Sequence, residues 1–129
     1  MIVPVLTQLR PDHTDDLVFF FRVCDWPFDP EQPFNPNNTI LALHKGQIVG
    51  FVTAWIDNQP YAYVDVLIVH PDFRGQGIGY YLAHAIREIV LRRGANAIRF
   101  NVTNPELVAT LERCSCTRVD ATVMEWKRK

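Results

Sequence analysis

The sequence predicts an α/β fold of the α+β type, built as a single domain over residues 1–129. Three strand-like segments follow one another between residues 39 and 69 with only short turns between them, which is typical of an antiparallel meander. Two segments with the apolar spacing of a helix then alternate with further strand-like segments. A length of 129 residues, of which 48 % are hydrophobic, suits one hydrophobic core rather than a disordered chain.

The N-terminal part is expected to hold a strand, a helix and a long loop. Ile2–Leu6 has the apolar character of a short strand, and Thr14–Cys24 has apolar residues at spacings of three and four, as in an amphipathic helix. Residues 25–38 contain four prolines and three asparagines, which predicts a long loop. Long loops rich in aromatic and acidic residues are often functional. The residues of this kind include Trp26, Phe28, Asp29 and Glu31.

The middle of the chain is expected to form three successive strands, Thr39–His44, Gln47–Ile56 and Tyr61–Val69. Lys45-Gly46 and residues 57–60 supply the turns between them. The third segment begins with alternating polarity and ends in a continuous apolar run, as expected for a strand that is covered on both faces.

The rest of the chain is expected to alternate helices and strands. The strongest helix is Ile78–Arg93, which has an apolar stripe and is followed by the helix-stop residue Gly94. Ala97–Val102 is the next strand, and Pro105 opens a second helix of about nine residues. Arg118–Trp126 is expected to be a single last strand.

Composition excludes several classes of protein. No apolar run approaches the ~20 residues of a membrane span, and the N-terminus lacks the basic and apolar segments of a signal peptide, so we expect a cytoplasmic protein without membrane attachment. Cys24, Cys114 and Cys116 are an odd number without a secretion signal, so we interpret them as reduced packing residues. The four histidines have no metal-ligand spacing, and no metal site is expected.

Charge is distributed unevenly along the chain. Residues 1–73 hold three Lys or Arg and nine Asp or Glu, whereas residues 74–129 hold ten and five. This asymmetry indicates two ligands of opposite charge, a homodimer with complementary faces, or an unevenly charged solvated surface. The basic residues are not interleaved with aromatic ones and the pI is about 6.4, so no nucleic-acid partner is expected.

A glycine-rich stretch, VHPDFRGQGIGY, joins the third strand of the meander to the strongest helix at residues 69–80. The first-turn N–H groups of a helix form an anion site, and an adjacent Arg74 favours a polyanion such as pyrophosphate. A Walker loop is excluded because the stretch has no lysine, and a dinucleotide fingerprint is excluded because Tyr80 stands where the third glycine belongs.

The stretch resembles the pyrophosphate motif of the GNAT superfamily of acetyl-coenzyme-A-dependent N-acetyltransferases, Gln/Arg-x-x-Gly-x-Gly/Ala, here Arg74-Gly-Gln-Gly77-Ile-Gly79. The longer family form V-x-P-x-x-R-G-x-G-I-G matches from Val69 to Gly79, and the order of elements matches the family over essentially the whole chain. The resemblance implies a central mixed, mostly antiparallel sheet flanked by helices, with acetyl-coenzyme A in the wedge between a splayed fourth and fifth strand.

The resemblance also implies which residues contact ligands. Leu67, Ile68 and Val69 match the strand segment that pairs with the pantetheine arm, and Asn104 matches an asparagine of the cofactor groove. The acidic loop, with Trp26, Phe28, Asp29 and Glu31, would face a cationic amine. The residues that match the pyrophosphate loop are Arg74, Gly75, Gln76, Gly77, Ile78, Gly79 and Tyr80.

The implied activity is transfer of an acetyl group to a primary amine of a small molecule, a protein lysine or a protein N-terminus. An amine with a pKa of ~10.4 must lose a proton before it attacks. Asp65 lies in the fourth strand where many family members carry an acid, so it is the candidate proton acceptor. Strand alternation leaves open an orientation away from the cleft, with a solvent-facing or ion-paired role.

One departure from the family concerns the proton donor. The later signature N-x-x-A-x-x-L-Y-x-x-x-G-F aligns from Asn104 to Cys116 and places Leu111 at the tyrosine. Leucine cannot donate a proton to the leaving thiolate, and the side chains that remain open as substitutes, besides water, are Cys114, Cys116, Tyr80 and Tyr81. The alternative function is therefore a catalytically weak or inactive module of this fold that binds coenzyme A, a protein partner or both.

Overall fold

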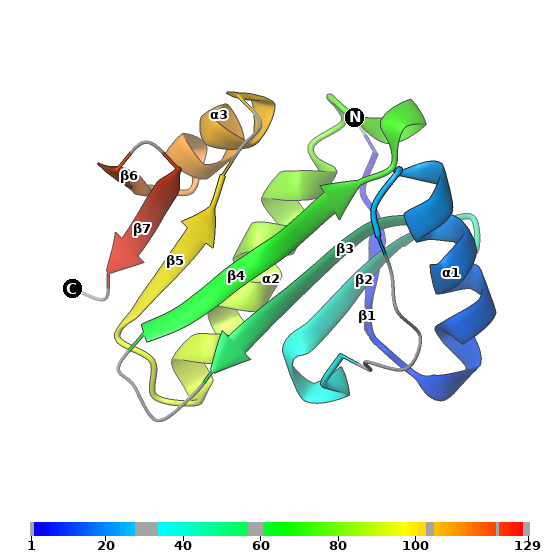
Figure 1. The fold of residues 1–129 in the computed structure, drawn as a ribbon, viewed down its shortest axis with the longest axis horizontal. Helices are drawn as coiled ribbons and strands as arrows, with labels where there is room; N and C mark the ends of the chain where they lie inside the picture. The colour runs from blue at the N-terminus through cyan, green and yellow to red at the C-terminus, as the bar shows by residue number, and fades with distance from the viewer. Residues whose placement is uncertain (1, 28–33, 57–60, 103–104, 121, 128–129) are drawn as a thin grey trace.

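The computed structural model describes residues 2–27, 34–56, 61–102, 105–120 and 122–127. Over these residues, seven strands form one sheet in the order β1-β2-β3-β4-β5-β7-β6 (Figure 1). The strands are β1 (Val5–Gln8), β2 (Thr39–His44), β3 (Gln47–Ile56), β4 (Tyr61–Val69), β5 (Ala97–Asn101), β6 (Thr117–Asp120) and β7 (Val123–Lys127). The α-helices are α1 (Thr14–Val23), α2 (Ile78–Arg92) and α3 (Pro105–Arg113).

The sheet is mixed and mostly antiparallel, as predicted, because β4 and β5 form its parallel pair. Pairing between these two strands runs from Tyr61 and Ala97 to Val64 and Phe100. Beyond that point β4 continues to Val69 while paired with β3. The two strands diverge toward their carboxyl ends (Figure 1), so the predicted splay of the fourth and fifth strands is confirmed.

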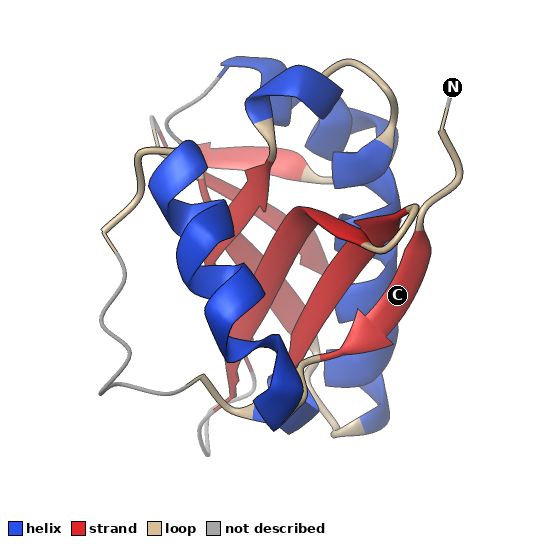
Figure 2. Cartoon of the chain, turned by 90° about the vertical axis from the view of Figure 1, so that its right-hand side faces the viewer, coloured by secondary structure: helices blue, strands red, loops and turns tan. Residues whose placement is uncertain are grey.

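Helices cover both faces of the sheet (Figure 2). On one face, α1 buries Leu17, Phe20 and Phe21 against Phe51 of β3 and Ile68 of β4. On the other face, α2 and α3 pack over a larger core. The residues that the two helices bury there are Ile78, Leu82, Ala83, Ile86, Val90 and Leu111. No helix among the described residues is long and apolar enough to cross a membrane.

A β-bulge interrupts β4 just before the splay. The register with β3 shifts so that Val64 and Asp65 together oppose Ala54. Ala62 and Leu67 consequently both contact the larger core, although regular alternation would direct residues at this spacing to opposite faces. Bulges re-aim side chains and are over-represented next to active sites. Simple alternation therefore does not assign Asp65 to a face of the sheet.

Expectations at the two ends of the chain were wrong. The first strand is β1 rather than Ile2–Leu6, because it begins only after Pro4, which has no N–H donor for a ladder. The predicted single strand Arg118–Trp126 is instead an antiparallel hairpin of β6 and β7, whose last pair is Asp120 and Val123. The hairpin allows β7 to pair with β5 on its other side.

Gly50 of β3 makes the close approach of α2 to the sheet possible. A Cβ at this position would lie 2.8 Å from Leu82 Cδ1 and 3.0 Å from Ile78 Cγ2. We expect Gly50→Ala to lower the free energy of unfolding by about 1–3 kcal/mol because the added methyl overpacks the core. Urea unfolding measures this change. Gly79→Ala is the matched control, since its Cβ would be 3.6 Å from Thr110 Cγ2, an ordinary contact, and a stability loss equal to that of Gly50→Ala would contradict the prediction.

Candidate functional site

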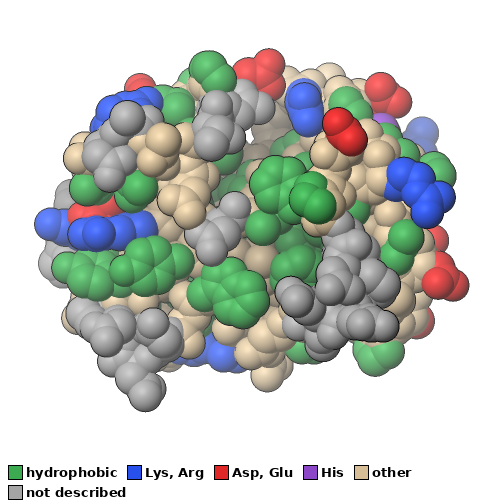
Figure 3. Space-filling view, in the orientation of Figure 1, with side chains coloured by type: hydrophobic (Ala, Val, Ile, Leu, Met, Phe, Trp, Pro, Cys, Tyr) green, Lys and Arg blue, Asp and Glu red, His purple; other side chains and the backbone are tan. Residues whose placement is uncertain are grey.

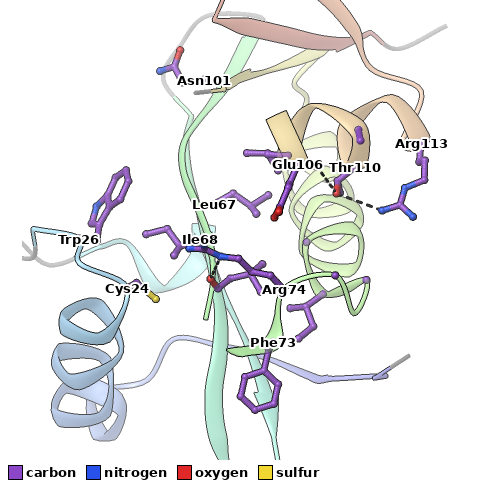
Figure 4. Close-up of a pocket in the computed structure, with 17 residues that line it drawn as sticks. Cys24, Trp26, Leu67, Ile68, Phe73, Arg74, Asn101, Glu106, Thr110 and Arg113 are labelled. Carbon is purple, nitrogen blue, oxygen red and sulfur yellow. Dashed lines mark hydrogen bonds between the residues drawn. The ribbon is translucent and has the colours of Figure 1, made fainter. Parts of the chain in front are cut away.

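A pocket of about 600 Å³ adjoins the splayed end of β4 (Figure 4). Leu67, Ile68 and Val69 of β4 form one wall, and Asn101 lies at the end of β5. The loop before α2, one side of α3 and the residues after α1 complete the lining. In the space-filling view, hydrophobic side chains gather in the middle of this face of the molecule, with charged side chains toward its margins (Figure 3).

The segment after β4 is held by local hydrogen bonds. The backbone N–H of His70 donates to Val49 O at 2.8 Å, and His70 Nδ1 accepts from the backbone N–H of Asp72 at 3.1 Å. Arg74 Nε donates to Val69 O at 3.3 Å. These bonds join the end of β4 to the turn Pro71–Phe73 and keep the exposed Arg74 beside the pocket (Figure 4).

The glycines of this loop allow the backbone to line the pocket directly. Gly75 and Gly77 have φ of 77° and 85°, which is the left-handed region that favours glycine. Gly77 is the N-cap of α2 and makes no side-chain cap, so the first-turn N–H groups of α2 are left for another acceptor. At Gly79, a Cβ would stand 3.6 Å from Thr110 Cγ2 and 3.8 Å from Val69 Cγ2, filling space between β4 and α3. This cradle of N–H groups and a nearby arginine fits a pyrophosphate-bearing cofactor.

One side of α3 lines the pocket opposite β4, and the sequence reasoning missed it. Glu106, Thr110 and Arg113 follow one another at helical spacing along this side (Figure 4). Thr110 Oγ1 accepts from Arg113 Nη2 at 3.5 Å and donates to Glu106 O at 3.2 Å. A polar stripe beside the buried Leu111 was the available signal, because such a stripe faces either solvent or a ligand.

Cys24 and Trp26 reach the pocket from the end of α1 (Figure 4). Trp26, a predicted substrate contact, is 41 % exposed, and its backbone N–H donates to Phe21 O at 2.9 Å. Cys24 was interpreted as a packing residue, and its place in the pocket was missed. Burial raises the pKa of the Cys24 thiol, and the nearby Arg74 cation opposes this rise. The thiol is therefore a weak acid in this setting.

The predicted site residues are thus partly brought together. Those that line the pocket are Trp26, Leu67, Ile68, Val69, Arg74, Gly75, Gly77, Ile78 and Gly79. Gln76 and Tyr80 belong to the same loop and helix start, but they are not among the lining residues of the described pocket. Those that lie outside the described residues are Phe28, Asp29, Glu31 and Asn104, together with the side chain of Asp65.

The residues around the aligned tyrosine position are core residues. Leu111 is fully buried, and Cys114 and Cys116 are also buried in the larger core. Burial raises the pKa of the Cys114 thiol, and burial together with Cys114 raises the pKa of Cys116 to about 12. Ser115, just after α3, has φ of 67°, which lies in the left-handed region of the backbone.

His84 links the stability of α2 to pH. Its Nδ1 lies 2.7 Å from Arg87 Nη2, and its Nε2 is buried without a hydrogen-bond partner in the described part of the chain. Burial, aided by the Arg87 cation and opposed by Glu88, lowers the pKa of His84 below 6.5. The unfolded chain then binds more protons, so we expect the free energy of unfolding to fall as the pH drops below 6.5.

Urea unfolding of the wild type and His84→Gln at several pH values checks this expectation. The stability difference between the two proteins should change between pH 6.5 and the lower folded pKa of His84 and be constant above that range. A difference that is the same at every pH would contradict it.

A metal centre finds no support within the described ranges, since they hold no group of three His, Cys, Asp or Glu side chains placed to bind an ion. The groups that line the described pocket include the glycine cradle before α2, the side chains of Arg74, Arg113 and Glu106, and the apolar walls.

Comparison with known proteins identifies relatives over most of the chain. The model of the acetyltransferase (GNAT) family matches residues 6–115. An acetyltransferase from Pectobacterium atrosepticum is 30 % identical over 124 residues, which cover 86 % of each chain. An acetyltransferase from Sodalis glossinidius is 26 % identical over 131 residues, covering 92 % of this chain and 91 % of the relative.

Solved structures with the same fold include an aminoglycoside 6'-N-acetyltransferase complexed with coenzyme A. It has a TM-score of 0.80 and 16 % identity, and the match covers 95 % of this chain and 96 % of that one. The ribosomal-protein-S18-alanine N-acetyltransferase from Escherichia coli has a TM-score of 0.76 and 14 % identity, with 97 % and 94 % covered. At these identities the likeness shows the fold alone.

Proposed function

Since the chain belongs to the GNAT family of acetyltransferases, we propose that it moves an acetyl group from acetyl-coenzyme A to a primary amine of a small molecule or a protein. The observation that carries the proposal is the pocket at the open end of β4, which is bounded by Arg74 and by the glycine cradle before α2. Arg74 and the N–H groups of the cradle would attract an anionic cofactor, and the splayed end of β4 leaves a strand edge along which the extended arm of that cofactor can lie.

The cofactor contacts follow from the positions of these groups. Arg74 and the first-turn N–H groups of α2 would bind the pyrophosphate, with Gly75 and Gly77 giving it access to the backbone. The edge of Leu67–Val69 that β5 leaves unpaired would exchange hydrogen bonds with the amide groups of the pantetheine. Further proposed contacts are Gln76, Ile78, Gly79, Tyr80 and Asn104. When bound, acetyl-coenzyme A supplies the acetyl group as a thioester.

The acceptor amine would enter from the side of the loop after α1. Trp26 lines the pocket there and offers an aromatic face to a cationic amine. We propose that Phe28, Asp29 and Glu31 of the same loop bind the acceptor, with the two carboxylates attracting its charge. Asp65 would then take the proton that the amine must lose, directly or through water. The bulge at Val64 and Asp65 supports this role, because it re-aims the strand beside the pocket.

Leu111 supplies no proton to the departing sulfur, and Cys114, Cys116, Tyr80 and Tyr81 do not line the described pocket. A thiol has a pKa of ~8.5, so a thiolate is a tolerable leaving group near neutral pH. We propose that the protein acts without a side-chain donor at position 111, relying on positioning of the reactants and on solvent water to protonate the departing thiolate.

Thiol release with a panel of amines tests the proposed activity. The panel contains a polyamine, an aminoglycoside, a lysine peptide and a peptide with an N-terminal alanine, of which the second and fourth follow the substrates named for two structural neighbours. We expect at least one amine to raise thiol release above hydrolysis and to gain the mass of one acetyl group. Binding of acetyl-coenzyme A without thiol release above hydrolysis for any amine of the panel would contradict the proposed acetyltransferase activity.

That second outcome is what the alternative function predicts. A catalytically weak or inactive module would bind coenzyme A or a protein partner, and the burial of Leu111 together with the raised thiol pKa values of Cys114 and Cys116 favours it. A stoichiometric protein partner whose binding is unaffected by acetyl-coenzyme A would support this reading. For either function, we propose one domain over residues 1–129, a cytoplasmic location and a homodimer as the assembly to test.

A further inference from the structure

Arg113 is a second arginine of the pocket, and the pyrophosphate loop does not account for it. It lies on the last turn of α3, whereas Arg74 lies on the loop before α2 (Figure 4). Coenzyme A carries a pyrophosphate and also a phosphate monoester on the 3′ position of its ribose. A phosphate monoester has a charge of about −1.5 to −2 at neutral pH, so a positively charged side chain separate from the one at the pyrophosphate would stabilise its binding.

The Arg113 guanidinium is held in place by neutral groups. Its Cζ lies over the ring of Tyr80, 5.9 Å from the ring centroid, and its Nη2 donates to Thr110 Oγ1 at 3.5 Å. Among the described residues, no carboxylate oxygen pairs with Arg113. An aromatic ring and a hydroxyl orient the guanidinium without neutralising it, so its positive charge and its paired N–H donors can bind a phosphate.

Tyr80 connects this arginine to the pyrophosphate cradle. It belongs to the first turn of α2, directly after Gly79, and its ring stands beside Arg113 of α3. The positive end of α2 therefore lies on the same side of the pocket as Arg113. A ligand with two phosphate groups on one nucleotide would meet the cradle with the first group and Arg113 with the second.

We propose that Arg113 binds the 3′-phosphate of the cofactor and makes this protein prefer coenzyme A to 3′-dephospho-coenzyme A. The inference rests on the proposed function, because that function supplies coenzyme A as the ligand. Arg113 acts here as a specificity residue for the cofactor, and Tyr80 and Thr110 are its positioning residues. The competing role is structural, since a basic side chain in the last turn of a helix also interacts favourably with the helix dipole.

Calorimetric titration with the two forms of the cofactor tests the proposal. We expect the wild type to bind coenzyme A about 10- to 100-fold more tightly than 3′-dephospho-coenzyme A, the size of a charge-assisted hydrogen bond. Arg113→Gln should lose this preference, with coenzyme A weakened and dephospho-coenzyme A bound as before. Arg113→Lys keeps the positive charge but lacks the paired N–H donors of the guanidinium, so it should retain only part of the preference for coenzyme A. This variant also provides the test if Arg113→Gln does not fold.

Arg92→Gln is the matched control. Arg92 is exposed at the end of α2 and is not a lining residue of the pocket, so the variant removes the same charge and should keep the full preference. Equal weakening of both ligands by Arg113→Gln would overturn the proposal in favour of a structural role. Equal affinity of the wild type for both ligands would overturn it while leaving the proposed function intact. A wild type that binds neither ligand would overturn both.

Discussion

Gly77→Glu is expected to lower the affinity for acetyl-coenzyme A by about 100-fold or more, because it harms the cradle in two ways. The residue has φ of 85°, where an added Cβ is strained by about 1–2 kcal/mol. The new carboxylate would also stand at the N-cap of α2, where it competes with the phosphate groups for the same N–H donors and repels them. Calorimetric titration measures the loss.

Gly94→Glu is the matched control for this prediction. Gly94 has φ of 92°, is exposed and follows the opposite end of α2, so the variant introduces the same strain and the same charge away from the pocket. We expect it to bind acetyl-coenzyme A as the wild type does. If Gly77→Glu is folded and also binds like the wild type, the cofactor cradle has been assigned to the wrong place.

Asp65→Asn is expected to lower kcat by ~10²–10⁴-fold, the usual contribution of a general base, while the affinity for acetyl-coenzyme A stays nearly constant. The asparagine has a similar size but does not take the proton of the amine. The deficit should shrink as the pH rises toward the amine pKa of ~10.4, since more of the acceptor then arrives deprotonated. Steady-state rates with the best amine of the panel, measured across pH, give kcat and its pH dependence.

Asp16→Asn provides the comparison, because Asp16 is an exposed acid in the first turn of α1 and does not line the described pocket. It should leave kcat and its pH dependence unchanged. A wild-type kcat in Asp65→Asn would remove Asp65 from the mechanism. A loss of cofactor affinity with unchanged kcat would assign it to binding instead.

The elements that were predicted best depend on local signals. The strands β2, β3 and β4 begin and end where the sequence predicted, because short turns and apolar patterning bound them on both sides. The hairpin of β6 and β7 was missed, since its division depends on Asp120 pairing with Val123 and on β5 accepting β7 as a neighbour. The bulge at Asp65 was missed for the same reason, because a register shift exists only between two paired strands.

The family and the glycine cradle could be predicted from the amino-acid sequence alone, because the residues from Arg74 to Gly79 are adjacent along the chain and their backbone requirements are local. The residues that face that cradle could not be predicted in this way, because they depend on tertiary packing. The pairing of β4 with β5 ends at Val64, and α1 and α3 then bring Cys24 and Arg113 to the same pocket from distant parts of the chain. Those positions follow from how the helices pack on a splayed sheet, and no local pattern encodes that packing.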